Sequence, residues 1–208
     1  MFVYDAEIIK AIQGKGESRV DGIEYCEGWH DYEGMGISVV CGYDYYTDRY
    51  RVFMEDNFEE LRDVFREHPG PFVGFNNIGF DNRLLRANDI FPDDGRCYDI
   101  LKEIWVSAGL APEFQYPSHI GYGLDDVLQV NFNGLQKSGN GAQAPVLWQL
   151  KQYAQVVDYC LDDVRLTKKV LDEILKTGRL INPKGLGCVD YCLDDVRLTK
   201  EVLVLPRP

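Results

Sequence analysis

Short β-rich runs alternate with helical segments along the first half of the chain, and this alternation limits the possible folds more than any other feature. The predicted strands are 1–4, 36–43, 49–54 and 72–75, with a further strand end near 97. Helices are predicted over 58–67, from about 80 to 88, within 97–108 and over 124–130. Such alternation is typical of an α/β protein with strands flanked by helices. With 208 residues, the chain is expected to form one domain, 1–208.

The second half begins with a loop and continues with a long helical pattern. Residues 131–145 are predicted to form a flexible, partly basic loop, because they contain the run Lys-Ser-Gly-Asn-Gly at 137–141. Apolar side chains then recur at helical spacing over 147–176, with a bend predicted near residue 155. Gly178 is the predicted helix stop. Short strands are predicted over 179–183 and 202–205.

Composition excludes several classes of protein. The sequence has neither an apolar run long enough to cross a bilayer nor a signal-peptide pattern, so a cytoplasmic location without membrane partners is expected. Six cysteines without a C-x-x-C pair favour free thiols over a disulfide scaffold or a zinc site. The net charge of −12 comes almost entirely from residues 1–100. Extended binding to a nucleic-acid duplex is therefore not expected.

The first acidic motif is Asp5-x-Glu7, at the C-terminal end of the opening apolar run. Residues i and i+2 of a strand point to the same side of the sheet. Two carboxylates at that separation repel each other unless they are protonated or share a cation, and Mg²⁺ or Mn²⁺ favours oxygen ligands of this kind. The motif therefore predicts either a metal site or a solvated turn.

The second acidic motif ends in Asp81, within the segment 77–81 between a predicted strand and a predicted helix. An aspartate at a helix start commonly accepts hydrogen bonds from backbone N–H groups, which is the structural interpretation. The functional interpretation makes Asp81 a third carboxylate of the same cleft. Asn76 or Asn77 is expected to hold a nearby turn through its side chain.

The third motif is Tyr159-x-x-x-Asp163 on the long predicted helix. Residues i and i+4 lie on one helix face, so the phenol and the carboxylate are neighbours. Taken alone, the pair is also explained by a packed tyrosine and a surface aspartate. Separate structural explanations account much less well for all three motifs occurring together in this order.

This series of motifs resembles the DEDDy 3′–5′ exonucleases of the ribonuclease H-like superfamily. The segment 74–81 is especially similar to the proofreading domains of B-family DNA polymerases. The sister DEDDh group has a histidine five residues before the last aspartate, where this chain has Asp158. The resemblance covers roughly residues 1–176 and implies a ribonuclease H-like fold, with a central mixed sheet flanked by helices.

The resemblance also implies a site and a reaction. Asp5, Glu7, Asp81 and Asp163 would hold two divalent ions, Mg²⁺ or Mn²⁺, and Tyr159 would orient the attacking water. The substrate would be the 3′ end of a single-stranded nucleic acid, with DNA favoured over RNA. Asn77 and Phe80 are weaker candidates for substrate binding. A separate polymerase or replication protein is the expected protein partner.

Two other functions stay open at this stage. One is a binding or regulatory module on the same fold, in which the acidic cluster is not catalytic. The other is an endonuclease or resolvase of the same superfamily. An assay with circular single strands separates the endonuclease, which cuts them, from an exonuclease, which does not.

The sequence Tyr-Cys-Leu-Asp-Asp-Val-Arg-Leu-Thr-Lys occurs twice, at 159–168 and at 191–200. The second copy follows a glycine-rich segment that is a poor helix interior, and a duplicate segment inserted at about 185–201 is the preferred explanation. Helix formation is cooperative, and only the first copy has helical neighbours on both sides. Tyr159 and Asp163 are therefore predicted to be the working pair, and Tyr191 and Asp195 an extra, non-catalytic copy. A swap or competition between the copies stays open.

Overall fold

The computed structural model describes residues 1–185 and 188–190, and strands and helices alternate along it. The strands are β1 (Phe2–Ile8), β2 (Ile37–Asp44), β3 (Arg49–Phe53), β4 (Phe72–Gly74), β5 (Cys97–Asp99), β6 (Arg179–Ile181) and β7 (Cys188–Asp190). The helices are α1 (Tyr32–Met35), α2 (Phe58–Glu67), α3 (Asp81–Ala87), α4 (Ile100–Ser107), α5 (Leu124–Asn131), α6 (Ala144–Gln149) and α7 (Tyr153–Thr177). The predicted α/β class is confirmed.

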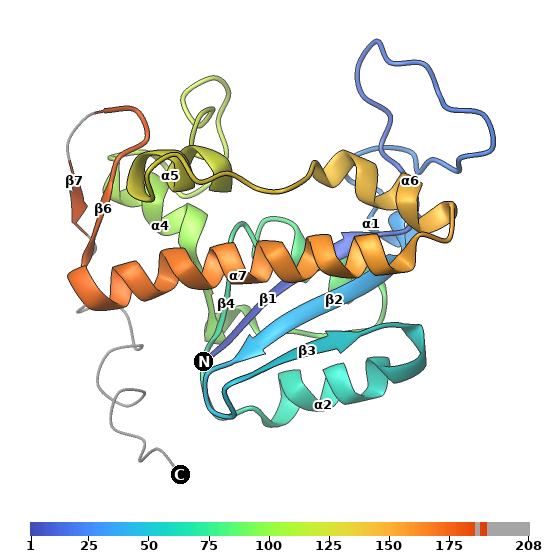
Figure 1. The fold of residues 1–208 in the computed structure, drawn as a ribbon, viewed down its shortest axis with the longest axis horizontal. Helices are drawn as coiled ribbons and strands as arrows, with labels where there is room; N and C mark the ends of the chain where they lie inside the picture. The colour runs from blue at the N-terminus through green and yellow to red at the C-terminus, as the bar shows by residue number, and fades with distance from the viewer. Residues whose placement is uncertain (186–187, 191–208) are drawn as a thin grey trace.

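The first five strands form one mixed sheet in the order β3-β2-β1-β4-β5 (Figure 1). β1 pairs antiparallel with β2 and parallel with β4, and β4 pairs parallel with β5. β2 and β3 form the predicted antiparallel hairpin. β1 therefore lies in the middle of the sheet, where hydrogen bonds along both edges fix the position of its backbone.

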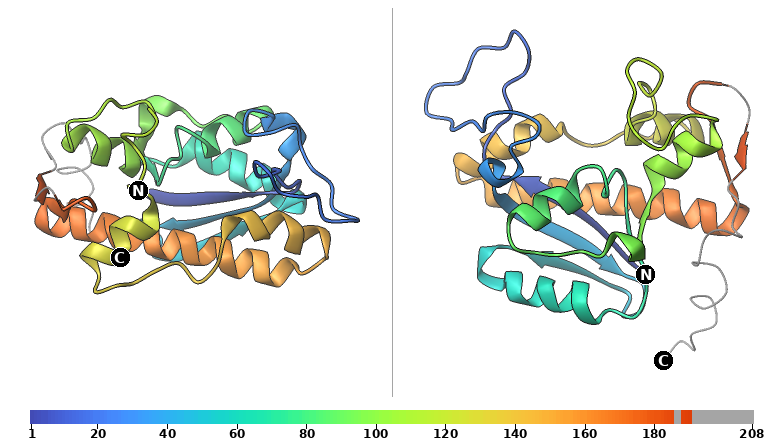
Figure 2. Two further views of the ribbon diagram at one scale, coloured as in Figure 1. Left: turned by 90° about the horizontal axis from the view of Figure 1, so that it is seen from above. Right: turned by 180° about the vertical axis from the view of Figure 1, so that it is seen from behind.

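Helices cover both faces of this sheet, and the side chains of β1 alternate between the two (Figure 2). Val3 packs in a hydrophobic cluster with side chains from α4, α5 and α7. Phe2, Tyr4, Ala6 and Ile8 pack in a second cluster with side chains from α2 and α3. Because Asp5 and Glu7 share the parity of Val3, their side chains lie on the face that α7 covers.

The long C-terminal helix lies across β1 and β2, as Figure 1 shows. The sequence predicts one helical stretch over 147–176 with a bend near 155, but the structure has two helices. The helical conformation is interrupted at 150–152. There Lys151 has φ 60°, a left-handed conformation that ends a helix. The predicted stop is confirmed, because Gly178 has φ 69° and its N–H bonds to the Ile174 carbonyl.

Beyond α7, the chain forms a second, two-stranded sheet, in which β6 pairs antiparallel with β7. The predicted strand over 179–183 is present as β6. The predicted strand over 202–205 and the second copy of the repeat, with Tyr191 and Asp195, lie outside the described residues. No helix within 1–185 and 188–190 combines the length and the apolar character that crossing a bilayer requires.

Candidate metal centre

Two carboxylates come from the central strand. Asp5 and Glu7 follow the alternation of β1 onto the α7 face, where Glu7 is buried and Asp5 is half-buried. Beside them, the Cys160 thiol of α7 lies 3.4 Å from the Asp5 carbonyl oxygen and 3.8 Å from Asp5 Oδ2. The strand and the helix are therefore in direct contact at the first acidic motif.

The third carboxylate comes from the middle of α7. Asp163 is one of nine buried residues of this helix, which together form the face that packs on the sheet. Its carboxylate lies beside those of Asp5 and Glu7, with one oxygen of each residue within 4.8 Å of the other two. Two motifs separated by more than 150 positions thus meet at one point.

The fourth predicted carboxylate, Asp81, approaches from the other side of β1. It is the first residue of α3 and is buried. Its Oδ1 accepts a hydrogen bond of 3.0 Å from the N–H of Ala6, the residue between Asp5 and Glu7. Asp81 is not part of the three-oxygen group, although it is close enough to Asp5 for the charge of Asp5 to help raise the pKa of Asp81, after burial.

The pKa values of the clustered carboxyl groups are raised above those of free side chains. Burial, followed by the nearby Asp163 charge, raises the pKa of Asp5 to about 8. The pKa values of Glu7 and Asp81 are also raised, first by burial and then by the charge of Asp5. Like charges in a buried site disfavour ionisation, and a bound cation removes that penalty.

A lysine and a tyrosine complete the cluster. The Lys137 ammonium forms an ion pair with Asp163 Oδ2 and lies 5.0 Å from the centre of the Tyr159 ring. Burial raises the pKa of Asp163, whereas the Lys137 charge and hydrogen bond lower it. Burial, then the Asp163 charge, raises the pKa of Tyr159, so its phenol stays protonated at neutral pH.

This arrangement fits a hard divalent cation. All three gathered groups are carboxylates, the ligand type that Mg²⁺ and Mn²⁺ prefer. Asp163 Oδ1 is buried and has no hydrogen-bond partner among the described residues, which leaves a lone pair free for a ligand. A single lysine charge does not balance three carboxylates, so a further positive charge suits the site.

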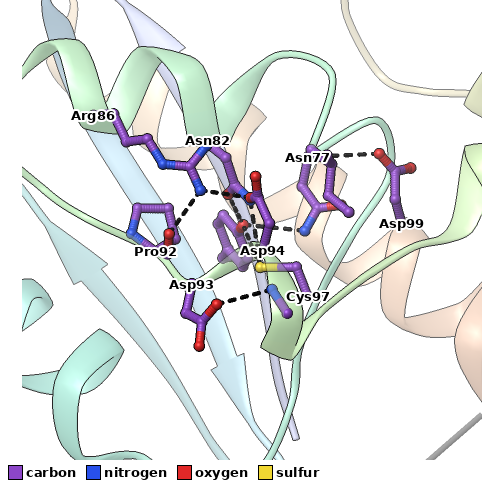
Figure 3. Close-up of polar contacts among 11 residues, drawn as sticks. Asn77, Asn82, Arg86, Pro92, Asp93, Asp94, Cys97 and Asp99 are labelled. Carbon is purple, nitrogen blue, oxygen red and sulfur yellow. Dashed lines mark hydrogen bonds and ion pairs between the residues drawn. The ribbon is translucent and has the colours of Figure 1, made fainter. Parts of the chain in front are cut away.

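Asn77, a predicted substrate contact, is fully buried. Its Nδ2 donates a hydrogen bond of 3.0 Å to the hydroxyl of Tyr4. Tyr4 in turn donates to Asn82 Oδ1, and Asn82 donates to Asp94 at 2.6 Å (Figure 3). Asn77 is thus part of a buried polar network through its Nδ2, and the prediction that it binds substrate stays open.

Phe80, the other predicted substrate contact, is half-buried. Its ring meets those of Trp29 and Tyr32 edge-on, at 6.4 and 5.9 Å between centroids. Trp29 is 64% exposed, so this aromatic group reaches the surface directly beside Asp81. The prediction that Phe80 binds substrate stays open.

Sequence reasoning missed the residue that shapes the turn before Asp81. Asn76 or Asn77 was expected to hold it, but the carboxylate of Asp99 at the end of β5 does so. Asp99 accepts hydrogen bonds from the N–H groups of Asn76 and Ile78, at 2.9 and 3.1 Å. It also accepts from Leu101 at the start of α4. The adjacency of β4 and β5, which brings Asp99 there, is not visible in the local sequence.

A cleft of about 440 Å³ opens beside Tyr159. It lies between α7 and the segment 138–147, which includes the start of α6, and its polar lining includes Ser138, Asn140, Gln143, Asp158, Tyr159 and Arg165. A solvent-filled space therefore reaches the phenol of the third motif.

No protein-family model and no curated protein sequence matches this chain.

Proposed function

We propose that this chain is a divalent-metal-dependent 3′–5′ exonuclease that removes nucleotides from the 3′ end of single-stranded nucleic acid, with DNA favoured over RNA. The observation that carries the proposal is the convergence of the three acidic motifs. Asp5 and Glu7 on β1, Asp81 on α3 and Asp163 on α7 surround one segment of the central strand. Chance placement of separate surface carboxylates does not account for their burial.

The architecture supports the finer assignment to a ribonuclease H-like fold of the DEDDy type. A mixed sheet with helices on both faces carries the first two carboxylates on its central strand. The last carboxylate comes from a long late helix, one turn after a tyrosine. Asp158, at the position of the DEDDh histidine, is exposed and lines the cleft instead.

The four carboxylates would hold the metal ions. When bound, two divalent ions supply a hydroxide-like water at neutral pH and stabilise charge on the transferred phosphoryl group. Asp5 contributes from the middle of the cluster, Glu7 and Asp163 from one side, and Asp81 from the other. The burial of Glu7, Asp81 and Asp163 strengthens the electrostatic interactions at the site.

Tyr159 would orient the attacking water through its hydroxyl. Its raised pKa keeps the phenol protonated, so it acts as a hydrogen-bonding group and not as a base. The cleft beside it gives the water and the terminal nucleotide access to the phenol.

Substrate binding would be local and short. The chain carries a net charge of −12, so only the last nucleotides are expected to contact the protein, partly through bases stacked near Phe80. Few phosphate contacts predict a small salt slope. A separate polymerase or replication protein would then supply the 3′ ends.

The test is a nuclease assay with 3′- and 5′-labelled DNA and RNA oligomers, each with Mn²⁺ and with EDTA. We expect stepwise shortening from the 3′ end that EDTA abolishes and that Asp5→Asn abolishes. Activity that survives EDTA would exclude the metal mechanism. Cleavage of a circular single strand would indicate the endonuclease, and release of no nucleotides with Mn²⁺ would indicate the binding module.

A further inference from the structure

Lys137 reaches into the carboxylate cluster from a segment that belongs to none of the three motifs. Its ammonium pairs with Asp163 Oδ2, and its side chain is 20% exposed against 6% for Asp163. Burial alone lowers the pKa of a lysine, but attraction to Asp163 outweighs it and raises the pKa of Lys137. The ion pair therefore places a positive charge directly on the carboxylate of the third motif.

The segment 137–141, here called the strap, is fastened at several points. The Lys137 N–H donates to Asp125 Oδ1 at 2.7 Å, and the Ser138 hydroxyl donates to Asp162 Oδ2 at 2.7 Å. At Gly139 the strap lies so close to Tyr159 that an added Cβ would be 2.9 Å from the ring carbon Cδ2. At Gly141 it would be 3.2 Å from the Tyr159 hydroxyl. These contacts hold Lys137 beside the Tyr159–Asp163 pair.

We propose that Lys137 is a built-in counter-ion that competes with the divalent cation for Asp163. A metal ion held by the free Asp163 Oδ1 would lie beside the ammonium that pairs with Oδ2 of the same carboxylate, and the two positive charges would repel each other at short range. Lys137 at Oδ2 then weakens metal binding, and a shift of Lys137 and the strap away from that oxygen relieves the repulsion. This inference rests on the proposed function, since it assumes that Asp163 is a metal ligand.

The measurement is Mn²⁺ binding to the chelator-treated full chain by isothermal titration calorimetry, with no nucleic acid present. Lys137→Met removes the charge and keeps the length of the side chain, and we expect it to bind Mn²⁺ about tenfold tighter than the unmodified protein. Lys168→Met is the matched control, because Lys168 is also on this side of the fold and pairs with a carboxylate, Asp172, at 2.7 Å. Its Mn²⁺ affinity should stay within about twofold of the unmodified protein.

Two further variants separate charge from position. Lys137→Arg keeps the positive charge, so its Mn²⁺ affinity should stay close to that of the unmodified protein. Gly139→Ala keeps Lys137 but forces the strap away from the Tyr159 ring, so Mn²⁺ binding should tighten as it does in Lys137→Met, though less. These variants also serve as the test if Lys137→Met does not fold.

The outcomes are distinguishable. Unchanged or weaker Mn²⁺ binding by both Lys137→Met and Gly139→Ala, with normal binding by the unmodified protein, would overturn the competition and leave the proposed function intact. Failure of every protein, the unmodified one included, to bind Mn²⁺ would overturn both. Tighter binding by Lys168→Met as well would show a general charge effect and would also overturn the competition at Asp163.

Discussion

The backbone N–H of Ala6 donates a hydrogen bond of 3.0 Å to Oδ1 of Asp81. This bond joins the central strand to the first turn of α3 at the peptide group that links Asp5 to Ala6. It fixes the second acidic motif against the first. The relative position of the carboxylates is therefore set by backbone geometry, which does not depend on a bound cation.

The two copies of the repeat are expected to differ in function. Asp163→Asn should lower nuclease activity more than about a hundredfold, because loss of a ligand exceeds the 10- to 100-fold cost of losing a ligand's supporting partner. Asp195→Asn should leave the activity unchanged. Single-turnover rates on a 3′-labelled single strand measure both. The reverse result would mean that the second copy fills the site.

The stability of the metal-free protein should fall as the pH rises. The pKa of Asp5 is about 8 when folded and 3.8 as a free side chain, so the folded state binds more protons between those values. The free energy of unfolding therefore decreases as pH rises through this window. Urea denaturation in EDTA at about pH 5.5 and about pH 8 measures the difference.

Asp5→Asn is the control for this pH dependence, because an amide carries no titrating proton. The variant should lose less stability over the same interval. Saturating Mn²⁺ should oppose the trend, since metal binding needs ionised carboxylates and stabilises the folded state. An unmodified protein whose stability in EDTA rises from pH 5.5 to 8 would contradict the raised pKa.

The buried hydrogen bonds that join Tyr4, Asn77 and Asn82 should contribute to the stability of the folded protein. Tyr4→Phe leaves Asn82 Oδ1 and Asn77 Nδ2 without their shared partner, and we expect a loss of about 1–3 kcal/mol in the free energy of unfolding. Tyr98→Phe is the matched control, because the buried Tyr98 hydroxyl has no hydrogen-bond partner within the described part of the chain. Its removal should cost nothing or stabilise slightly. Equal losses in the two variants would contradict this account.

Tyr159→Phe should slow the reaction without changing the shape of its pH profile. Loss of the hydroxyl removes the group that orients the water, and misplacement of a reactant costs up to about a hundredfold in rate. The phenol of the unmodified protein does not titrate near neutral pH, because its pKa is raised. Loss of a basic limb from the pH–rate profile of the variant would show instead that Tyr159 acts as a base.

Phe80 should contribute to substrate binding more than to the rate of cleavage. Phe80→Ala is expected to raise KM for single-stranded DNA, because stacking on an aromatic side chain is worth about 1–3 kcal/mol per base. Phe91→Ala is the control, since Phe91 is 69% exposed and belongs to none of the three acidic motifs. An unchanged KM for Phe80→Ala, with its fold intact by circular dichroism, would assign Phe80 to packing alone.

Much of the fold follows from short-range patterns. The β2–β3 hairpin, α2 and the C-terminal end of α7 at Gly178 lie where the sequence predicts them, because turn residues and apolar spacing act over a few positions. The break at 150–152 was not predicted at its position. No glycine or proline marks it; Lys151 takes the left-handed conformation that closes α6, and the N–H of Gln152 bonds back to the Leu147 carbonyl.

By itself, the sequence determined which carboxylates share a face. A period of two on β1 pairs Asp5 with Glu7, and a spacing of four on α7 pairs Tyr159 with Asp163, because these separations are properties of strand and helix geometry. The tertiary structure alone decided what meets them: Asp81 at the Ala6 amide, Asp99 at the turn before Asp81, and Lys137 at Asp163. Those contacts join residues more than twenty positions apart, and they depend on how the sheet and its helices pack. No local pattern encodes that packing.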